Sequence, residues 1–171
     1  EDNTTFIVGT HYMGFYVATT GYPTASISGI GTLPAGIVFE DNHDGTAMFW
    51  GTPLAGSEGV YTIDITASNG VGTAATQEFT LTVVPAPVAP TITSDPATSF
   101  TVGSADSFDI TTTGYPLPSI AVTSGTLPTG LSFTDDGDGT ARIWGTPATG
   151  EGGVYTLTIT ASNGELPNAT Q

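Results

Sequence analysis

The sequence contains one segment twice. Residues 31–70 read GTLPAGIVFEDNHDGTAMFWGTPLAGSEGVYTIDITASNG, and residues 125–164 read GTLPTGLSFTDDGDGTARIWGTPATGEGGVYTLTITASNG. Gly31 recurs as Gly125, which sets an offset of 94 residues between the copies. This period is too long for a solenoid repeat of roughly 20 to 50 residues, and it matches a small domain with its own core. The 171 residues therefore predict two tandem domains, an arrangement that usually works through spacing and surface contact.

Short runs of alternating apolar residues dominate each copy. The run VYTLTITA places Tyr155, Leu157, Ile159 and Ala161 on one side and threonines on the other, which is the pattern of a half-buried strand. The 23 glycines and 12 prolines fall between such runs, as in all-β chains with many turns. No segment has a helical period, and no apolar run is long enough to insert into a membrane.

We expect each copy to form an immunoglobulin-like β-sandwich of seven strands. Tyr61 and Tyr155 each begin a strand shortly after a glycine, as in the tyrosine corner of such sandwiches, and are expected to be structural. The last strand of the first copy is expected at about 75–84. In the second copy the strands are expected at about 91–95, 99–102, 106–113, 119–123, 130–134, 140–144 and 153–161.

The predicted boundaries are a first domain at 1–84, a linker at 85–90 and a second domain at 91–171. The linker reads PAPVAP, and three prolines in six residues favour the extended polyproline II conformation. We therefore expect a short, semi-rigid connection with the two domains joined end to end.

The 94-residue offset also compares the two ends of the chain. Glu1 falls on Asp95, so the first copy is expected to lack most of its first strand. Gln171 falls on Gln77, so the equivalent of Glu78–Val84 is expected to be missing from the second copy. Such a domain has an unpaired edge. Either the polypeptide continues with this strand or a neighbouring chain donates it.

The charge balance is strongly acidic. Sixteen acidic residues stand against one basic residue, Arg142, which gives a net charge of −15. Nucleic acids and anionic membranes require lysine and arginine, so both are excluded as partners. Solubility and an affinity for calcium are the two interpretations of this acidity. The chain has no cysteine, so disulfides do not stabilise the domains.

Three motifs carry a family resemblance. The segments GTLPTGLSF, IWGTP and GVYTLTITASNG, each present in both copies with small changes, resemble the immunoglobulin-like, cadherin-like tandem repeats of large bacterial and archaeal surface proteins. The resemblance covers nearly the whole chain. It implies disulfide-free β-sandwiches in long extracellular arrays at the cell surface, without enzymatic activity.

Two acidic turns are candidate metal sites. FTDDGDGT at 133–140 carries Asp135, Asp136 and Asp138, which could supply about half of the oxygen ligands of a calcium ion. A plain hairpin turn explains the same residues, because Asp and Gly favour turns. The topology of a seven-stranded sandwich places this turn near the junction of the domains, where Glu58 could join the site. The other copy, with Glu40, Asp41 and Asp44, is a weaker candidate.

Two tryptophans are candidate contacts for a ligand or partner. Alternation places Trp50 and Trp144 on the strand face opposite the core, where an exposed aromatic ring usually marks an interaction surface. The alternative is that a twist or a loop covers each ring. Asn3 and Asn168 begin two N-glycosylation sequons, which matter only in a host that glycosylates.

No catalytic constellation is present in the sequence. His11 and His43 lack a paired acid and nucleophile at a repeated position. We interpret the chain as a non-catalytic structural module of an extracellular stalk or filament, with neighbouring repeats or other filament subunits as partners and no required cofactor. The alternative is a carbohydrate-binding accessory region of a secreted enzyme or adhesin.

Overall fold

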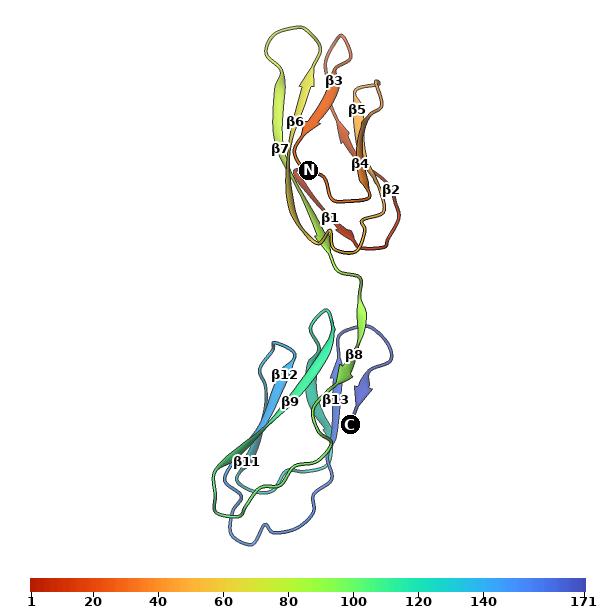
Figure 1. The fold of residues 1–171 in the computed structure, drawn as a ribbon. Helices are drawn as coiled ribbons and strands as arrows, with labels where there is room; N and C mark the ends of the chain where they lie inside the picture. The colour runs from red at the N-terminus through yellow and green to blue at the C-terminus, as the bar shows by residue number, and fades with distance from the viewer. The chain divides into compact units, whose positions relative to one another are not determined.

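The computed structural model describes residues 1–171 as two compact units, Glu1–Ala86 (unit 1) and Pro87–Gln171 (unit 2), as Figure 1 shows. All of the regular structure is β, with seven strands in each unit, which confirms the predicted fold class. No helix of the chain is long and apolar enough to cross a membrane.

Unit 1 consists of a four-stranded and a three-stranded sheet. Their strand orders are β1-β7-β6-β3 and β2-β5-β4. Neighbouring strands are antiparallel except β1 and β7, which run parallel with Asn3 opposite Thr80 and Ile7 opposite Val84. The strands are β1 (Asn3–Ile7), β2 (Tyr12–Ala18), β3 (Ser26–Ile30), β4 (Ile37–Asp41), β5 (Thr46–Gly51), β6 (Gly59–Ser68) and β7 (Ala75–Val84).

The core of unit 1 lies between the two sheets. Phe79, Leu81 and Val83 of β7 are at most 2% exposed, as the alternation predicts. The rings of Phe49 and Phe79 stack with centroids 4.9 Å apart, so the two sheets meet through aromatic contacts. Each side chain of this size that is buried stabilises the fold by about 1.5–3 kcal/mol.

Unit 2 divides its seven strands differently. Its three-stranded sheet has the order β10-β13-β14, and its four-stranded sheet has the order β11-β12-β9-β8. All of its strand pairs are antiparallel. The strands are β8 (Val88–Ile92), β9 (Asp106–Tyr115), β10 (Ser119–Ser124), β11 (Leu131–Asp135), β12 (Thr140–Gly145), β13 (Thr158–Ser162) and β14 (Ala169–Thr170).

Two strand predictions for unit 2 were wrong for one shared reason. The segment at 99–102 is not a strand, although β1 occupies the corresponding place in unit 1. The strand expected from 153 begins only at Thr158. In unit 1 the corresponding segments pair with β7. In unit 2, β14 pairs with β13 at Thr160 and Ala161, and Gln171 adds one pair with Ile159, where the pairing ends. Without a full partner strand, neither segment of unit 2 completes a ladder.

The predicted linker at 85–90 is too long. Strand β7 ends at Val84, and β8 already begins at Val88, which pairs with Tyr115. The connection is therefore the tripeptide Pro85–Pro87. Pro90 lies within β8, at a register shift between Val88 and Thr91, where a ladder tolerates the missing N–H group.

The repeat is not a uniform 94-residue offset. Strand β2 has a register shift between Tyr12 and Phe15, and β10 has one between Val122 and Ser124. The irregularity in β2 reduces the offset between the copies from 94 to 93, so Phe15 corresponds to Phe108. The irregularity in β10 restores the offset to 94, so Gly31 corresponds to Gly125. A β-bulge changes which residues face outward, so β2 could not be read by alternation alone.

The family motif closes one end of the sandwich through a pair of glycines. The N–H group of Thr52 donates to the carbonyl of Gly36 at 3.0 Å. Gly36 has φ +89°, and an added Cβ would lie 2.0 Å from the Thr52 carbonyl oxygen. Gly51 has φ +125°, and its Cβ would lie 2.2 Å from the Gly36 carbonyl. The segments LPAG and WGTP therefore bind each other through backbone that no larger residue could occupy.

Both predicted tyrosine corners form. The hydroxyl of Tyr61 donates to the carbonyl of Ser57 at 2.9 Å, four residues upstream. Tyr155 donates to the Glu151 carbonyl at 3.2 Å and also lies 2.9 Å from the Glu151 carboxylate. The interpretation of these tyrosines as structural residues is confirmed.

Candidate interaction surfaces

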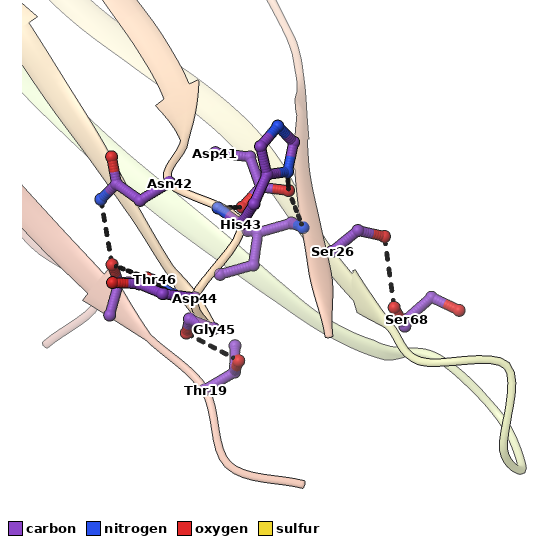
Figure 2. Close-up of polar contacts among 10 residues, drawn as sticks. Thr19, Ser26, Asp41, Asn42, His43, Asp44, Gly45, Thr46 and Ser68 are labelled. Carbon is purple, nitrogen blue, oxygen red and sulfur yellow. Dashed lines mark hydrogen bonds and ion pairs between the residues drawn. The ribbon is translucent and has the colours of Figure 1, made fainter. Parts of the chain in front are cut away.

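The acidic turn of unit 1 is held by its own carboxylates (Figure 2). One oxygen of Asp41 accepts the N–H of Ile27 at 3.0 Å, and the other accepts the N–H of His43 at 2.9 Å. Asp44 accepts the N–H of Thr46 at 2.9 Å and its hydroxyl at 2.5 Å. These bonds hold the turn between β4 and β5 and attach it to β3, in the other sheet.

The same bonds recur in unit 2. Asp135 accepts the N–H groups of Ile120 at 3.0 Å and of Gly137 at 3.1 Å. Asp138 accepts the N–H and the hydroxyl of Thr140 at 3.0 and 2.6 Å. The first and last predicted calcium ligands of this turn therefore stabilise the turn itself, as in the alternative interpretation.

The remaining predicted ligands lie apart from such contacts. Asp136 is exposed between these two turn residues, and Glu58 is exposed in the β5–β6 loop of unit 1. No three Asp, Glu or His side chains of the chain gather closely enough to hold a metal ion. Calcium binding at Asp135, Asp136, Asp138 and Glu58 stays a prediction from the sequence.

The turn carboxylates give unit 1 a pH dependence. The hydrogen bonds from Ile27 and then His43 lower the pKa of Asp41, and Thr46 lowers the pKa of Asp44. A carboxyl group with a lowered folded-state pKa stabilises the fold above about pH 4, and this contribution is lost as the pH falls through the folded-state pKa.

We expect Asp41→Asn to lower the unfolding free energy of unit 1 by about 1 kcal/mol at pH 7, because an amide offers one acceptor oxygen to two N–H donors. At pH 3 the difference should shrink, because the wild-type carboxyl then takes up a proton. Urea unfolding at both pH values measures this. Glu58→Gln, in an exposed loop, is the control. An equal loss at both pH values would contradict the role given to the charge.

The tryptophans lie on the outer faces of the sheets, as the alternation predicts. Ala47 and Phe49 face the core, and Trp50 between Phe49 and Gly51 faces away. Its indole N–H donates to Glu40 on β4 at 2.9 Å. The indole of Trp144 donates to Thr134 at 3.1 Å, and Thr134 occupies the position of Glu40 in the repeat. A cross-strand hydrogen bond thus fixes each ring.

The outer faces around the two rings differ. In unit 1, Tyr16 is 62% exposed and pairs with Met48, so the face is apolar. In unit 2, the corresponding pair is Asp109 and Arg142, whose charged groups lie 2.8 Å apart. Tyr16 is not among the residues predicted from the sequence, because the register shift in β2 obscures its outward position. Tyr16 lies directly opposite Met48 in the β2–β5 ladder, and this pairing identifies it as a residue of the outer face.

We expect acrylamide to quench Trp144 more strongly than Trp50. Trp144 is 48% exposed, whereas Trp50 is mostly covered beside Glu40. Trp50→Phe leaves Trp144 as the only tryptophan, and Trp144→Phe leaves Trp50, so Stern–Volmer slopes of the tryptophan emission of the two variants give the comparison. Equal slopes would contradict the difference in exposure between the two indole rings.

The other candidate residues are exposed and dispersed. Asn3 lies in β1, and Asn168 precedes β14. His43 lies in the acidic turn with φ 61°, 3.3 Å from the Asp41 carboxylate. His11 lies 3.1 Å from the hydroxyl of Thr52. Neither histidine is part of a nucleophile–base–acid arrangement.

The family model described as "Putative Ig domain" matches the sequence twice, at residues 2–84 and 86–171. The chain belongs to this family of immunoglobulin-like domains, and the resemblance seen in the sequence motifs is confirmed. No curated protein matches the sequence.

Two solved structures with TM-scores of at least 0.50 share the fold at low sequence identity, and a third is less similar. The complex of Dpr11 IG1 with DIP-gamma IG+IG2 is 13% identical with a TM-score of 0.53, over 99% of this chain and 92% of that chain. The endo-fucoidan hydrolase MfFcnA9 is 19% identical with a TM-score of 0.50, over 99% of this chain and 32% of that chain. The Drosophila receptor phosphatase DLAR Ig1-2 module is 20% identical, with a TM-score of 0.39 over 99% and 93% of the two chains. The chain thus spans about a third of the hydrolase.

Proposed function

We propose that the chain is a non-catalytic, load-bearing spacer within an extracellular surface protein or filament. The observation that carries the proposal is the parallel pair β1 and β7 of unit 1. Membership in the immunoglobulin-like family supports it. The net charge of −15 suits a module that stays soluble and does not associate non-specifically.

The parallel pair matters because of where its strands connect to the chain. Strand β1 begins at Asn3, close to the start of unit 1, and β7 ends at Val84, where the chain leaves the unit. Tension applied at these two ends pulls the strands along their length in opposite directions. All the ladder bonds from Asn3↔Thr80 to Ile7↔Val84 are then loaded together. An antiparallel hairpin pulled from its open end would break one bond at a time.

The ladder continues beyond the strands themselves. The N–H of Val8 donates to the carbonyl of Val84 at 3.0 Å, and the N–H of Thr80 donates to the carbonyl of Asp2 at 2.9 Å. Phe6, between these bonds, is buried in the core and stacks on Tyr12 with ring centroids 3.9 Å apart. Separating β1 from β7 therefore also exposes core surface, which raises the barrier.

Val8→Pro tests the proposal, because it removes the N–H that binds Val84. Under tension applied at the ends of the chain, we expect this variant to open unit 1 at a clearly lower force than the wild type. Gly56→Ala is the matched control, since it strains a loop outside the loaded ladder. If both variants lower the force equally, the parallel pair does not bear the load.

Carbohydrate binding is a second candidate, favoured by the fixed outer tryptophans. Each indole is oriented by a cross-strand hydrogen bond, and Tyr16 adds an exposed ring beside the partly covered Trp50 in unit 1. Such rings stack on the apolar faces of sugars, with nearby hydroxyl and carboxylate groups as hydrogen-bond partners. The acidic surface would disfavour anionic polysaccharides, so the expected ligand is neutral.

Affinity electrophoresis in gels that contain soluble neutral glucans, mannans or xylans tests this candidate. Retardation of the wild type that is lost in Trp50→Ala and Trp144→Ala would support it. Equal mobility of the wild type with and without each polysaccharide would remove it, while the load-bearing proposal would be unaffected.

A further inference from the structure

The outer face of the β2–β5–β4 sheet in unit 1 is covered with apolar side chains. Tyr16, Met48 and Trp50 lie on it, together with Met13 and Val38, which are 87% and 44% exposed. We call these five residues the apolar face. They include both methionines of the chain. Tyrosine, tryptophan and methionine are enriched in the cores of protein–protein interfaces, and acidic residues are depleted there, so this composition is typical of a protein contact.

The corresponding face of unit 2 is polar. Apart from Trp144, its outward residues at the same places in the ladders are Ser107, Asp109, Ser132 and Arg142. The sandwich therefore forms without apolar residues on this face. An apolar face that folding does not require indicates a surface for interaction.

The register shift in β2 shapes the apolar face. Between the pairs Tyr12–Gly51 and Phe15–Phe49, this strand has two residues opposite Trp50. One of them is Gly14, where an added Cβ would lie 3.2 Å from the Tyr16 ring and 3.4 Å from the Met48 sulfur. Because Gly14 has no side chain, the ring of Tyr16 lies along β2 beside the thioether, a contact that both groups favour. The ring thus leaves a low surface on which a second sheet can pack.

Charge restricts how two copies of this chain can meet. With 16 acidic residues against one basic residue, two chains repel each other over most of their surfaces. On the outer face of the other sheet of unit 1, Asp64 lies directly opposite Glu78. Among the outward residues of β2, β4 and β5, only Glu40 is charged. The apolar face is therefore the sheet face of unit 1 where a second copy meets the least repulsion.

The apolar face is also complementary to itself. Tyr16 and Glu40 lie on either side of Met48, one on each neighbouring strand. A twofold axis parallel to β5 at Met48 would place Met48 against its own copy. The same axis would place each Tyr16 hydroxyl against the Glu40 carboxylate of the other copy. In the next row, Val38 of one copy would meet Met13 of the other.

We propose that the apolar face joins two copies of this chain into a twofold symmetric dimer, with unit 1 packed on unit 1, sheet against sheet. Such an isologous contact uses the same surface on both copies and closes on itself. It goes beyond the load-bearing role and is independent of it, because β1 and β7 belong to the other sheet.

Sedimentation equilibrium of the 171-residue chain tests the dimer. We expect a monomer–dimer equilibrium for the wild type. Met48→Asp should raise the dissociation constant by about tenfold or more, because each copy would bury a carboxylate at the centre of the contact. Ser28→Asp is the matched control, since it adds the same charge to exposed β3 in the other sheet and should change nothing. A wild type that stays monomeric at millimolar concentration, or equal weakening by both variants, would overturn the proposal.

An exchange of charges tests the pairing of Tyr16 with Glu40. Tyr16→Glu should weaken the dimer, because it places a carboxylate against Glu40 of the other copy. Adding Glu40→Lys should restore the dimer, which also shows that the variant folds. Adding Ser28→Lys instead gives the same net charge and should not restore it. Failure of Glu40→Lys to restore the dimer, or equal restoration by both lysines, would contradict this arrangement.

Discussion

Gly36→Ala is expected to destabilise unit 1 by about 3 kcal/mol or more, enough to unfold a marginal domain. The new Cβ would lie 2.0 Å from the Thr52 carbonyl oxygen, at a residue whose φ is +89°. Relief of this clash requires breaking the bond from the Thr52 N–H to Gly36, and with it the end of the sandwich. Urea unfolding followed by Trp50 fluorescence, in a Trp144→Phe background, measures the loss.

Gly56→Ala separates the clash from the cost of the backbone conformation. Gly56 has φ +87°, nearly that of Gly36, but an added Cβ would meet nothing within 4 Å. We expect a loss of only about 1–2 kcal/mol from the left-handed conformation. If the two variants lost the same stability, the contact between LPAG and WGTP would not explain the motif.

Phe79→Ala should cost unit 1 about 3–5 kcal/mol, because it leaves a cavity in a fully buried site. The ring of Phe79 contacts both Phe49 and Phe15, with centroids 4.9 and 5.3 Å away, so the surrounding rings cannot easily collapse into the space. Thermal unfolding read by Trp50 in the Trp144→Phe background gives the loss. Thr80→Ala, on the opposite side of β7, is the control and should change stability by less than about 0.5 kcal/mol.

The same variant tests whether the two cores are separate. Each unit has its own cluster of buried residues. Unfolding of unit 2, read by Trp144 in a Trp50→Phe background, should not change when Phe79 is replaced. A parallel shift of both transitions would contradict the division into two independent cores.

The 94-residue repeat and the alternation of apolar residues predict most of the fold. The repeat predicted two domains, and the alternation at Phe79, Leu81 and Val83 predicted the inward face of β7. These signals work because each depends on residues close together in the sequence. The failures at 99–102 and 153–157 concern strands that form only when a distant partner is present. Whether such a partner strand is available depends on the whole sheet and not on the local sequence.

The candidate sites were predicted less completely. The outward position of Trp144 followed from its parity with Ile143, but the partners Glu40 and Thr134 depend on strand register, which the sequence does not state. The acidic turns were located correctly, yet their carboxylates bind backbone N–H groups. The Asp135–Ile120 bond joins residues 15 apart, across two sheets, and only the structure reveals it.

The most direct test of load bearing compares two pulling directions within unit 1. The chain has no cysteine, so pairs of introduced cysteines define the attachment points. Asp2→Cys with Pro85→Cys loads the β1–β7 ladder along the strands, whereas Thr10→Cys with Pro85→Cys peels it open from Ile7 and Val84. We predict a several-fold higher unfolding force for the first pair at the same loading rate. Equal forces in the two directions would contradict the account.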